Sequence, residues 1–407
     1  MEQDKNKVFR LQGKVQQYAW GGHSYLPALL GIRDPGERPY AEYWMGAHDN
    51  ASSEIFLSGE RPVRLNEYIG SFSGDLLGES VAGRFGRLPY LLKILDVKDM
   101  LSIQVHPSKK EAEKEFRAEN EKGISLNAPD RNYKDDNHKP ELMVALSEFW
   151  LLHGFRPEGP LKAMLQKIPE LSFLLPIFEK NGYLELYRTV MEMEQPKVNS
   201  LLQPLLDRIV PAYKEGRLLK NNEDFWVARA ALTFNTDGRV DRGIFSIYLF
   251  NLVNLHPGEA IFQDAGLPHA YLEGQNVEIM ANSDNILRGG LTPKHIDVPE
   301  LMKHIVFART VPHTIYGKEV APYIAAFLTP APDFELSRIE IPENSAVGIE
   351  AHSVEIFIVL QGKIEITEKG GNVFERKRGE CFIAFDRAEF SLQSRADAVL
   401  YRAGVPQ

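Results

Sequence analysis

Short apolar runs, separated by glycine, proline, asparagine and aspartate, characterise residues 1–157 of the chain. The runs 89–95 and 101–106 are typical, because each has the length of a strand and is bounded by turn-forming residues. After the second run, Ser108 can cap the N-terminus of a helix, with Glu111 as its partner in a capping box. We therefore expect many strands here, with a helix beginning after Ser108.

The pattern changes to a helical period between residues 158 and 230. Apolar residues recur there at intervals of three and four, which places them on one face of a helix. They are Leu161, Met164, Leu165, Ile168, Val198, Leu201, Leu202 and Leu205. Pro169, Pro196 and Pro211 predict breaks between several short helices. The segment has no cluster of His, Glu and Asp, so we interpret it as a structural or lid element.

Strand character returns after this segment. Residues 246–253 and 260–262 form apolar runs that predict strands, and a helix is indicated at 299–302. The end of the chain, from about residue 329, alternates between apolar and polar positions. Closely spaced strands with glycine turns are typical of a β-barrel or jelly roll.

The clearest strands of the C-terminal part are 354–360, which is apolar throughout, and 363–367, which alternates. A turn at Gln361 and Gly362 separates them. The sequence also contains a short internal repeat, because Gly-Glu precedes an apolar strand in both 256–262 and 377–383. Together these features predict two related jelly rolls, on either side of a link near residue 325.

Charge and cysteine content restrict the function. The net charge of −9 argues against a protein that binds nucleic acid through a basic face. With one cysteine, Cys381, the chain cannot form an intrachain disulfide or a cysteine-rich zinc site. Residues 1–5 are charged rather than apolar, and no apolar run approaches the length of a membrane helix. We expect a cytoplasmic protein without a signal peptide.

Two segments combine residue types that bind metal ions. Gln104 and His106 are two residues apart in a predicted strand, so their side chains point to the same face, and Glu141 follows downstream. The second segment contains Pro268 and His269. Two imidazoles, a carboxylate and an amide oxygen suit Zn²⁺ and also accept Mn²⁺, Fe²⁺ or Co²⁺. Each motif alone also fits an ordinary strand or turn, so their order is more informative than any one of them.

The order of the motifs resembles the cupin superfamily. There, one strand supplies two ligands and then a glutamate, and a second motif runs from a glycine through a proline to a last histidine. Gly258, Pro268 and His269 match the second motif at a slightly longer spacing. Nearly the whole chain resembles the type I mannose-6-phosphate isomerase family. The matching stretches are 16–21, 41–48, 101–107, 137–141, 154–156 and 258–294.

The resemblance implies a mainly β fold with an α-helical insert, made of two cupin-type jelly rolls plus a helical domain. The catalytic jelly roll would comprise residues 1–157 together with 231–325, and the helical insert residues 158–230. Residues 326–407 would form a C-terminal cupin-like domain. His352 and Glu355 lie where its first metal motif could sit, but no closing histidine follows. We therefore expect this last domain to be metal-free.

The resemblance further implies a zinc-dependent aldose-ketose isomerase of carbohydrate metabolism, connected to GDP-mannose biosynthesis. It would interconvert mannose 6-phosphate and fructose 6-phosphate through an enediol(ate), with one zinc ion per chain. The implied metal ligands are Gln104, His106, Glu141 and His269. Zinc at the sugar oxygens would act as a Lewis acid, and a nearby base must carry the proton between the two carbons.

Other residues are placed in the pocket by the same resemblance. Arg288 is the strongest catalytic candidate, at the substrate and the enediolate. Glu278, Asp284, His138 and Lys93 are candidates for the proton carrier. Burial in an apolar strand could raise the pKa of Glu278 towards a useful range, although a buried glutamate can equally support a metal-bound histidine.

The expected substrate-binding residues are Lys139 and Ser102, at the phosphate, and Trp20 and Tyr271, as pocket walls. Two other functions remain open. One is another metal cupin enzyme, such as an iron dioxygenase or a different sugar-phosphate isomerase, and the other is a sugar-binding protein without activity. Lys139 and Arg288 argue against the dioxygenase, and the complete set of metal residues argues against the binding protein. We expect a small sugar phosphate as partner, no nucleic acid or membrane, and a monomer.

Overall fold

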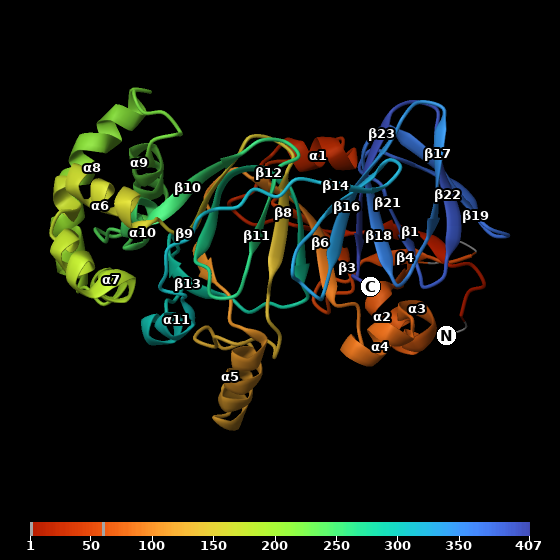
Figure 1. Ribbon diagram of the computed structural model, residues 1–407, viewed down its shortest axis with the longest axis horizontal. Helices are drawn as coiled ribbons and strands as arrows, with labels where there is room; N and C mark the ends of the chain where they lie inside the picture. Colours follow the sequence, from red (N-terminus) through yellow and green to blue (C-terminus); the bar gives the residue numbers. More distant parts are fainter. Residues whose placement is uncertain (1–2, 59–61) are drawn as a thin grey trace.

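The computed structural model describes residues 3–58 and 62–407. The molecule is elongated, with helices at one end, strands wrapped around the centre, and further sheets of the C-terminal part at the other end (Figure 1). Within these described ranges, no helix combines the length and the apolar character needed to cross a membrane. Met1 and Glu2, which belong to the segment expected to lack a signal peptide, lie outside the described residues.

The strands at the centre belong to one antiparallel sheet. They are β2 (Lys14–Gln16), β3 (Glu42–Gly46), β6 (Tyr90–Val97), β7 (Ile103–Val105), β8 (Glu141–Ala145), β9 (Phe149–Phe155), β10 (Phe250–Leu255), β11 (Ala260–Gln263), β12 (His269–Ala281) and β13 (Leu287–Gly290). The long strand β12 pairs with β6, β7, β8 and β9 and so connects most of them. The strands predicted over 89–95, 101–106 and 260–262 are confirmed as β6, β7 and β11.

The C-terminal part is built from two further sheets. Their strands are β1 (Val8–Gln12), β4 (Glu54–Phe56), β5 (Pro62–Arg64), β14 (Lys318–Ala321), β15 (Ile324–Phe327), β16 (Glu335–Ile341), β17 (Ser345–Glu350), β18 (Glu355–Gln361), β19 (Lys363–Glu368), β20 (Val373–Lys377), β21 (Cys381–Ala384), β22 (Glu389–Ser394) and β23 (Ala398–Gly404). One sheet has the order β14-β15-β16-β23-β18-β21-β1-β4-β5, and the other β17-β22-β19-β20. Because β1 pairs with β21, the beginning of the chain lies in the sheet of its end.

The helices gather mainly at one end of the molecule, where they form a layer beside β9 and β10 (Figure 1). These are α6 (Glu158–Lys167), η1 (Pro169–Leu171), α7 (Leu174–Met191), α8 (Gln195–Lys214), α9 (Glu223–Phe234) and α10 (Gly243–Leu249). The remaining helices are α1 (Tyr25–Leu30), α2 (Leu65–Ser71), α3 (Ser73–Leu77), α4 (Glu79–Phe85), α5 (Lys109–Glu121) and α11 (Val298–His304). The helical pattern is confirmed, and the apolar face of α8 joins a core that includes Phe155 and Phe250.

Two details of the helical region differ from the prediction. Residues 246–249 belong to α10 rather than to a strand, which begins only at Phe250. All of α10 is buried, and a run that is apolar on every side has no periodicity to separate helix from strand. Pro211 also fails to end a helix, because α8 continues through it to Lys214 while its apolar face stays packed. Pro196 does mark a helix start.

Helix α5 begins where the sequence predicts. The hydroxyl oxygen of Ser108 accepts a hydrogen bond from the backbone N–H of Glu111 at 3.3 Å, which is the expected N-cap. The carboxylate of Glu111 pairs with Lys114 at 3.3 Å instead of closing a capping box. The helix projects from the central sheet towards solvent (Figure 1).

The short internal repeat of the sequence corresponds to a turn that occurs twice in the structure. In the first copy, Gly258 has φ +88° and donates its N–H to the carbonyl oxygen of Ala145 at the end of β8 (2.8 Å). The backbone N–H of His256 bonds to the carboxylate of Glu259 at 2.8 Å. This turn therefore uses both residues of the Gly-Glu pair, glycine for its left-handed backbone and glutamate for its side-chain oxygen.

The second copy makes the same contacts. Gly379 has φ +84° and donates to the carbonyl oxygen of Val359 in β18 (2.8 Å), while Lys377 N–H bonds to the carboxylate of Glu380 at 3.1 Å. Strand β18 is thus the counterpart of β8. Glu141 begins β8 and Glu355 begins β18, so these two carboxylates occupy corresponding positions.

The carboxylate of Glu355 is paired with the guanidinium of Arg402. The guanidinium of Arg402 makes two hydrogen bonds to it, one of them from Nε to Oε2 at 2.8 Å. Replacement of Arg402 by methionine is expected to lower the free energy of unfolding by about 3 kcal/mol, because it leaves a buried carboxylate without its partner. Urea denaturation measures this loss. The double variant with Glu355→Gln should recover most of it, and an equally unstable double variant would contradict the pairing.

Candidate active site

Strand register brings residues that are distant in sequence into one row. Gln104 in β7 lies opposite His269 in β12 and opposite Arg288 in β13, and His269 also lies opposite His153 in β9. Opposite residues of antiparallel strands project from the same face. His106 shares the face of Gln104, because it lies two residues further along the chain.

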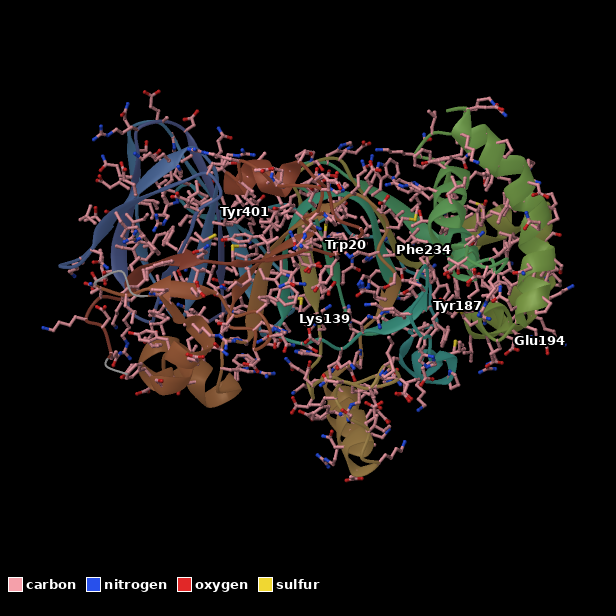
Figure 2. The ribbon with its side chains drawn as sticks, turned by 180° about the vertical axis from the view of Figure 1, so that it is seen from behind. Trp20, Lys139, Tyr187, Glu194, Phe234 and Tyr401 are labelled. Carbon is pink, nitrogen blue, oxygen red and sulfur yellow. The ribbon has the colours of Figure 1, made fainter. Side chains whose placement is uncertain are left out.

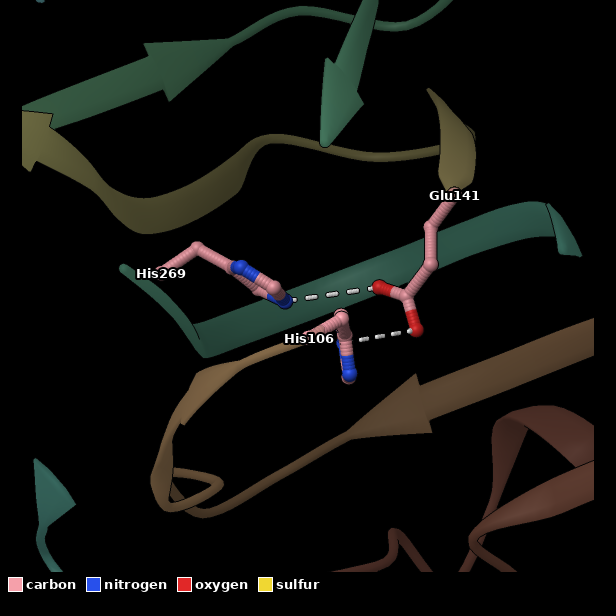
Figure 3. A group of neighbouring side chains, drawn as sticks. All are labelled: His106, Glu141 and His269. Carbon is pink, nitrogen blue, oxygen red and sulfur yellow. Dashed lines mark ion pairs between the residues drawn. The ribbon is translucent and has the colours of Figure 1, made fainter. Parts of the chain in front are cut away.

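Three of the predicted metal ligands meet in a buried cluster (Figure 3). The Nε2 atoms of His106 and His269 each lie 3.4 Å from one oxygen of Glu141, Oε1 and Oε2 respectively. All three side chains are buried. Their ligand atoms lie within 4.8 Å of one another, which is close enough for one ion to contact them all.

Hydrogen bonds on the far side of each imidazole fix its tautomer. Nδ1 of His106 lies 2.8 Å from the carbonyl oxygen of Asn285, and Nδ1 of His269 lies 2.9 Å from that of Leu267. A carbonyl oxygen only accepts, so each Nδ1 carries a hydrogen and each Nε2 is the ring nitrogen directed towards Glu141. Nε2 of His106 is buried without a hydrogen-bond partner among the described residues, as expected for an atom that binds a metal.

The ionisation of the cluster also suits a cation. Burial, reinforced by the Lys139 charge, lowers the pKa of His106 to about 4, so its imidazole is neutral. Burial alone would raise the pKa of Glu141, but Lys139 and the histidines outweigh it and hold that pKa well below its usual range. Gln104 lines the same cavity as Glu141 and His269. These two imidazoles, one carboxylate and one amide oxygen fit a zinc ion.

A cavity of about 610 Å³ opens beside this cluster. Most of the residues predicted for the site line it: Trp20, Lys93, Ser102, Gln104, Lys139, Glu141, His269, Tyr271, Glu278, Asp284 and Arg288. Trp20 and Lys139 lie at the centre of the molecule, and Phe234 lies towards the helical end (Figure 2). The volume of this cavity suits a small-molecule ligand.

His138 is the predicted catalytic candidate that the structure directs away from this cavity. It is absent from the lining, and its Nε2 lies 2.8 Å from the buried carboxylate of Asp333 in the C-terminal part. The next residue, Lys139, points the opposite way, and its Nζ lies 3.0 Å from Glu141. Consecutive residues of an extended segment point to opposite sides, so only one of them can reach the cavity.

A buried ionic layer forms another wall of the cavity. Nζ of Lys93 lies 3.1 Å from Glu278 and 3.4 Å from Glu42, and also lies over the ring of Trp44. Burial would lower the pKa of Lys93, but the two glutamates raise it, so the ammonium stays charged. Burial raises the pKa of Glu278 despite the opposing charge of Lys93.

Asp284 and Tyr271 also line the cavity, and their surroundings shift the pKa of each. Asp284 lies 3.3 Å from Nε2 of His48, and this hydrogen bond helps to lower the pKa of Asp284 against the raising effect of burial. The hydroxyl of Tyr271 is buried without a hydrogen-bond partner in the described ranges. Burial raises its pKa well above the usual value, so it remains a neutral donor.

Two cations line the cavity without an ion-pair partner in the described part of the chain. Within residues 3–58 and 62–407, the side chains of Arg288 and Lys294 make no ion pair or hydrogen bond. Burial lowers the pKa of both, and the Arg288 charge lowers that of Lys294 further. Together they form a basic part of the cavity wall, where a bound anion would relieve this repulsion.

The sequence analysis missed several lining residues. Lys294 falls inside the stretch 258–294 that carried the resemblance, so its charge could have been noticed. Glu42 likewise lies in the matched stretch 41–48. Thr233 and Phe234, at the end of α9, gave no signal, because only the packing of the helices brings them to the cavity.

Comparison with known proteins identifies the family. The model of the catalytic domain of type I phosphomannose isomerase matches residues 8–158. Mannose-6-phosphate isomerase of Escherichia coli (strain K12) is 36% identical over 393 residues, which are 94% of this chain and 96% of the relative. The chain belongs to the type I phosphomannose isomerase family. The enzyme from Bos taurus is 34% identical over 434 residues, 98% of each chain.

Solved structures of this family share the fold. A phosphomannose isomerase mutant from Salmonella typhimurium is 33% identical, with a TM-score of 0.87 over 98% of this chain and 100% of the other. A mannose 6-phosphate isomerase from the same organism, described as bound to its substrate f6p and to zinc, is 32% identical with a TM-score of 0.86 and the same coverage. The mainly β fold with helices is therefore the phosphomannose isomerase fold.

Proposed function

We propose that the chain interconverts mannose 6-phosphate and fructose 6-phosphate with one bound zinc ion. The main supporting observation is the cluster of His106, Glu141 and His269, which brings two imidazole nitrogens and a carboxylate together beside a cavity lined also by cations that have no acidic partner among the described residues. The family relatives named above have this activity in their names, and a Salmonella structure is described with substrate and zinc.

His106, Glu141, His269 and Gln104 would hold the zinc. When bound, it supplies Lewis acidity that stabilises negative charge on sugar oxygens. The neutral imidazole of His106 and the ionised carboxylate of Glu141 are already in the protonation states that a metal requires, so binding displaces no proton from these two groups. His153 lies beside this set, opposite His269 in the strand register, and its Nδ1–H donates to the amide oxygen Oε1 of Gln263 at 3.0 Å.

Arg288 and Lys294, together with Ser102, are the better candidates for the phosphate than Lys139. The charge of Lys139 is already opposed by Glu141 at 3.0 Å, whereas Arg288 and Lys294 lack an acidic partner among the described residues. A dianionic phosphate gains most from cations that are not already neutralised. Lys139 then lies beside the metal ligands, near the reacting end of the sugar.

Glu278 is the proposed proton carrier. Its carboxylate lines the cavity, and burial raises its pKa towards the range in which a carboxyl group both takes and returns a proton. It would remove the proton from carbon 2 of the aldose and return it to carbon 1. Lys93 holds the carboxylate in place, while Asp284, kept ionised by His48, is suited to orient a sugar hydroxyl.

The finer domain organisation belongs to this proposal. Residues 1–157 with 231–325 would form the catalytic cupin jelly roll, 158–230 the helical insert, and 326–407 a metal-free jelly roll, although β1, β4, β5, β14 and β15 lie in a sheet of the C-terminal part. The repeated turn before β11 and β21, which bonds to β8 and β18 respectively, supports two related barrels. Arg402 on Glu355, at the position that corresponds to Glu141, supports the absence of a metal in the second. The cytoplasmic location and the monomeric state stay predictions.

A coupled assay of mannose 6-phosphate turnover tests the proposal. We expect a chelator to lower kcat of the purified protein at least about 10³-fold, because the ion that stabilises the developing negative charge is lost. Added zinc should restore the activity. Circular dichroism checks that the apo protein stays folded. Absence of turnover in every metal state of a folded sample would reject this substrate, in favour of another sugar phosphate or of a binding function.

A further inference from the structure

We infer that Asp241 is a positioning residue for phosphate recognition, because its carboxylate holds the backbone that follows β13, between Arg288 at the end of that strand and Lys294 in the loop after it. The inference rests on the proposed function. Asp241 lies outside the cavity lining and would not touch substrate. It would act through the loop of residues 288–294.

The carboxylate of Asp241 is fully used by backbone donors. Oδ1 accepts from the N–H of Gly243 at 2.7 Å and of Leu291 at 2.9 Å, and Oδ2 accepts from the N–H of Thr292 at 3.1 Å. Hydrogen bonds to an ionised acceptor are stronger than those between neutral groups. Two of the three donors belong to the cavity loop, and the third begins α10, so this carboxylate joins the helical region to the loop.

The loop adopts a backbone that needs such support. Gly290 has φ +133°, and Leu291 has φ +53°, which is unfavourable for a residue with a branched side chain. Gly290 and Gly243 are in backbone contact, since a Cβ on Gly290 would lie 2.4 Å from Cα of Gly243. The carboxylate of Asp241 therefore bridges two segments that touch, and the left-handed turn at Leu291 directs the following residues along the cavity.

Asp241 also connects to the part of the cavity wall formed by the end of α9. Its own N–H donates to Oδ1 of Asn235 at 2.9 Å, and Asn235 follows Phe234, which lines the cavity at the end of α9. A short chain of hydrogen bonds thus runs from the end of α9 to Thr292. The helical region is consequently a part of the substrate site rather than only an attached structural element.

Electrostatics explains why the loop requires a fixed anchor. Arg288 and Lys294 repel each other, and no acidic side chain among the described residues pairs with them. Without an anchor, this repulsion favours loop conformations that separate the two cations. The bonds from Asp241 keep both cations at the cavity before the substrate binds, so its phosphate meets a preformed site.

The test is a kinetic comparison of the Asp241→Asn variant with the wild type. Asparagine keeps the shape but has a single acceptor oxygen, and its NH₂ group cannot accept from a backbone N–H. We expect KM for mannose 6-phosphate and the inhibition constant of inorganic phosphate to rise together by about tenfold, while kcat changes less than about threefold. Zinc content should equal that of the wild type. Asp207→Asn, an exposed carboxylate on α8, is the matched control.

A second variant removes fewer hydrogen bonds and keeps the test valid if Asp241→Asn fails to fold. Asn235→Ala removes only the bond to the Asp241 N–H and should raise KM and the phosphate inhibition constant in the same proportion by a smaller factor. Unchanged KM in folded Asp241→Asn and Asn235→Ala proteins, or a loss confined to kcat, would overturn the inference. Loss of zinc from either variant would overturn it too. A wild type without turnover would instead reject the proposed function, so the two failures are distinguishable.

Discussion

The His269→Ala variant is expected to lose both its zinc and its activity, with kcat/KM for mannose 6-phosphate reduced at least about 10³-fold. His269 supplies one of two imidazole nitrogens within 3.4 Å of the Glu141 carboxylate, and alanine offers no replacement ligand. Its removal also leaves Lys139 and His106 as the remaining partners of a buried carboxylate. Zinc content by elemental analysis and turnover in the coupled assay measure the two losses.

The matched control is His313→Ala, because His313 is exposed and distant in sequence from the cluster. It should keep zinc and turnover within about twofold of the wild type, as surface substitutions usually do. If the His269→Ala protein kept one zinc per chain, the assignment of His269 as a ligand would be wrong. Retained activity after verified loss of zinc would instead show that the ion has no role in the reaction.

The parts of the fold with strong periodicity could be predicted from the sequence. The helices after residue 158 follow from their apolar spacing, and the start of α5 follows from Ser108. Residues 246–249 could not be assigned, because a completely buried helix has the same composition as a buried strand. The pairing of β1 with β21 also had no local signal, since it joins the two ends of the chain.

In the site too, features set by neighbouring residues could be predicted, whereas those set by distant contacts could not. Gln104 and His106 could be grouped from strand spacing, while Glu141 and His269 were candidates by residue type that the resemblance joined to them. Side-chain direction was not available, so His138 was expected in the cavity although the structure turns it to Asp333. The roles of Lys294 and Asp241 depend on which charges lack partners and which backbone groups need one, and only the packed structure provides that information.

Replacement of Arg288 by alanine is expected to leave zinc in place and to reduce kcat/KM by about 10²- to 10³-fold. Arg288 lies opposite Gln104 in the strand register, as His269 does. Its guanidinium makes no ion pair among the described residues, so its removal leaves no buried carboxylate without a partner. The loss should therefore appear in catalysis and not in stability. Elemental analysis, thermal unfolding and the coupled assay separate these quantities.

The division of the loss between KM and kcat decides what Arg288 contacts. A rise in KM with unchanged kcat would mean that it binds the phosphate equally in the ground state and the transition state, whereas a fall in kcat would place it at charge that develops during enolisation. Arg288→Lys keeps the charge but not the planar fork and should recover only part of the activity. Arg395→Ala, at an exposed C-terminal position, serves as the control. Near-normal turnover of Arg288→Ala would remove this residue from the active site altogether.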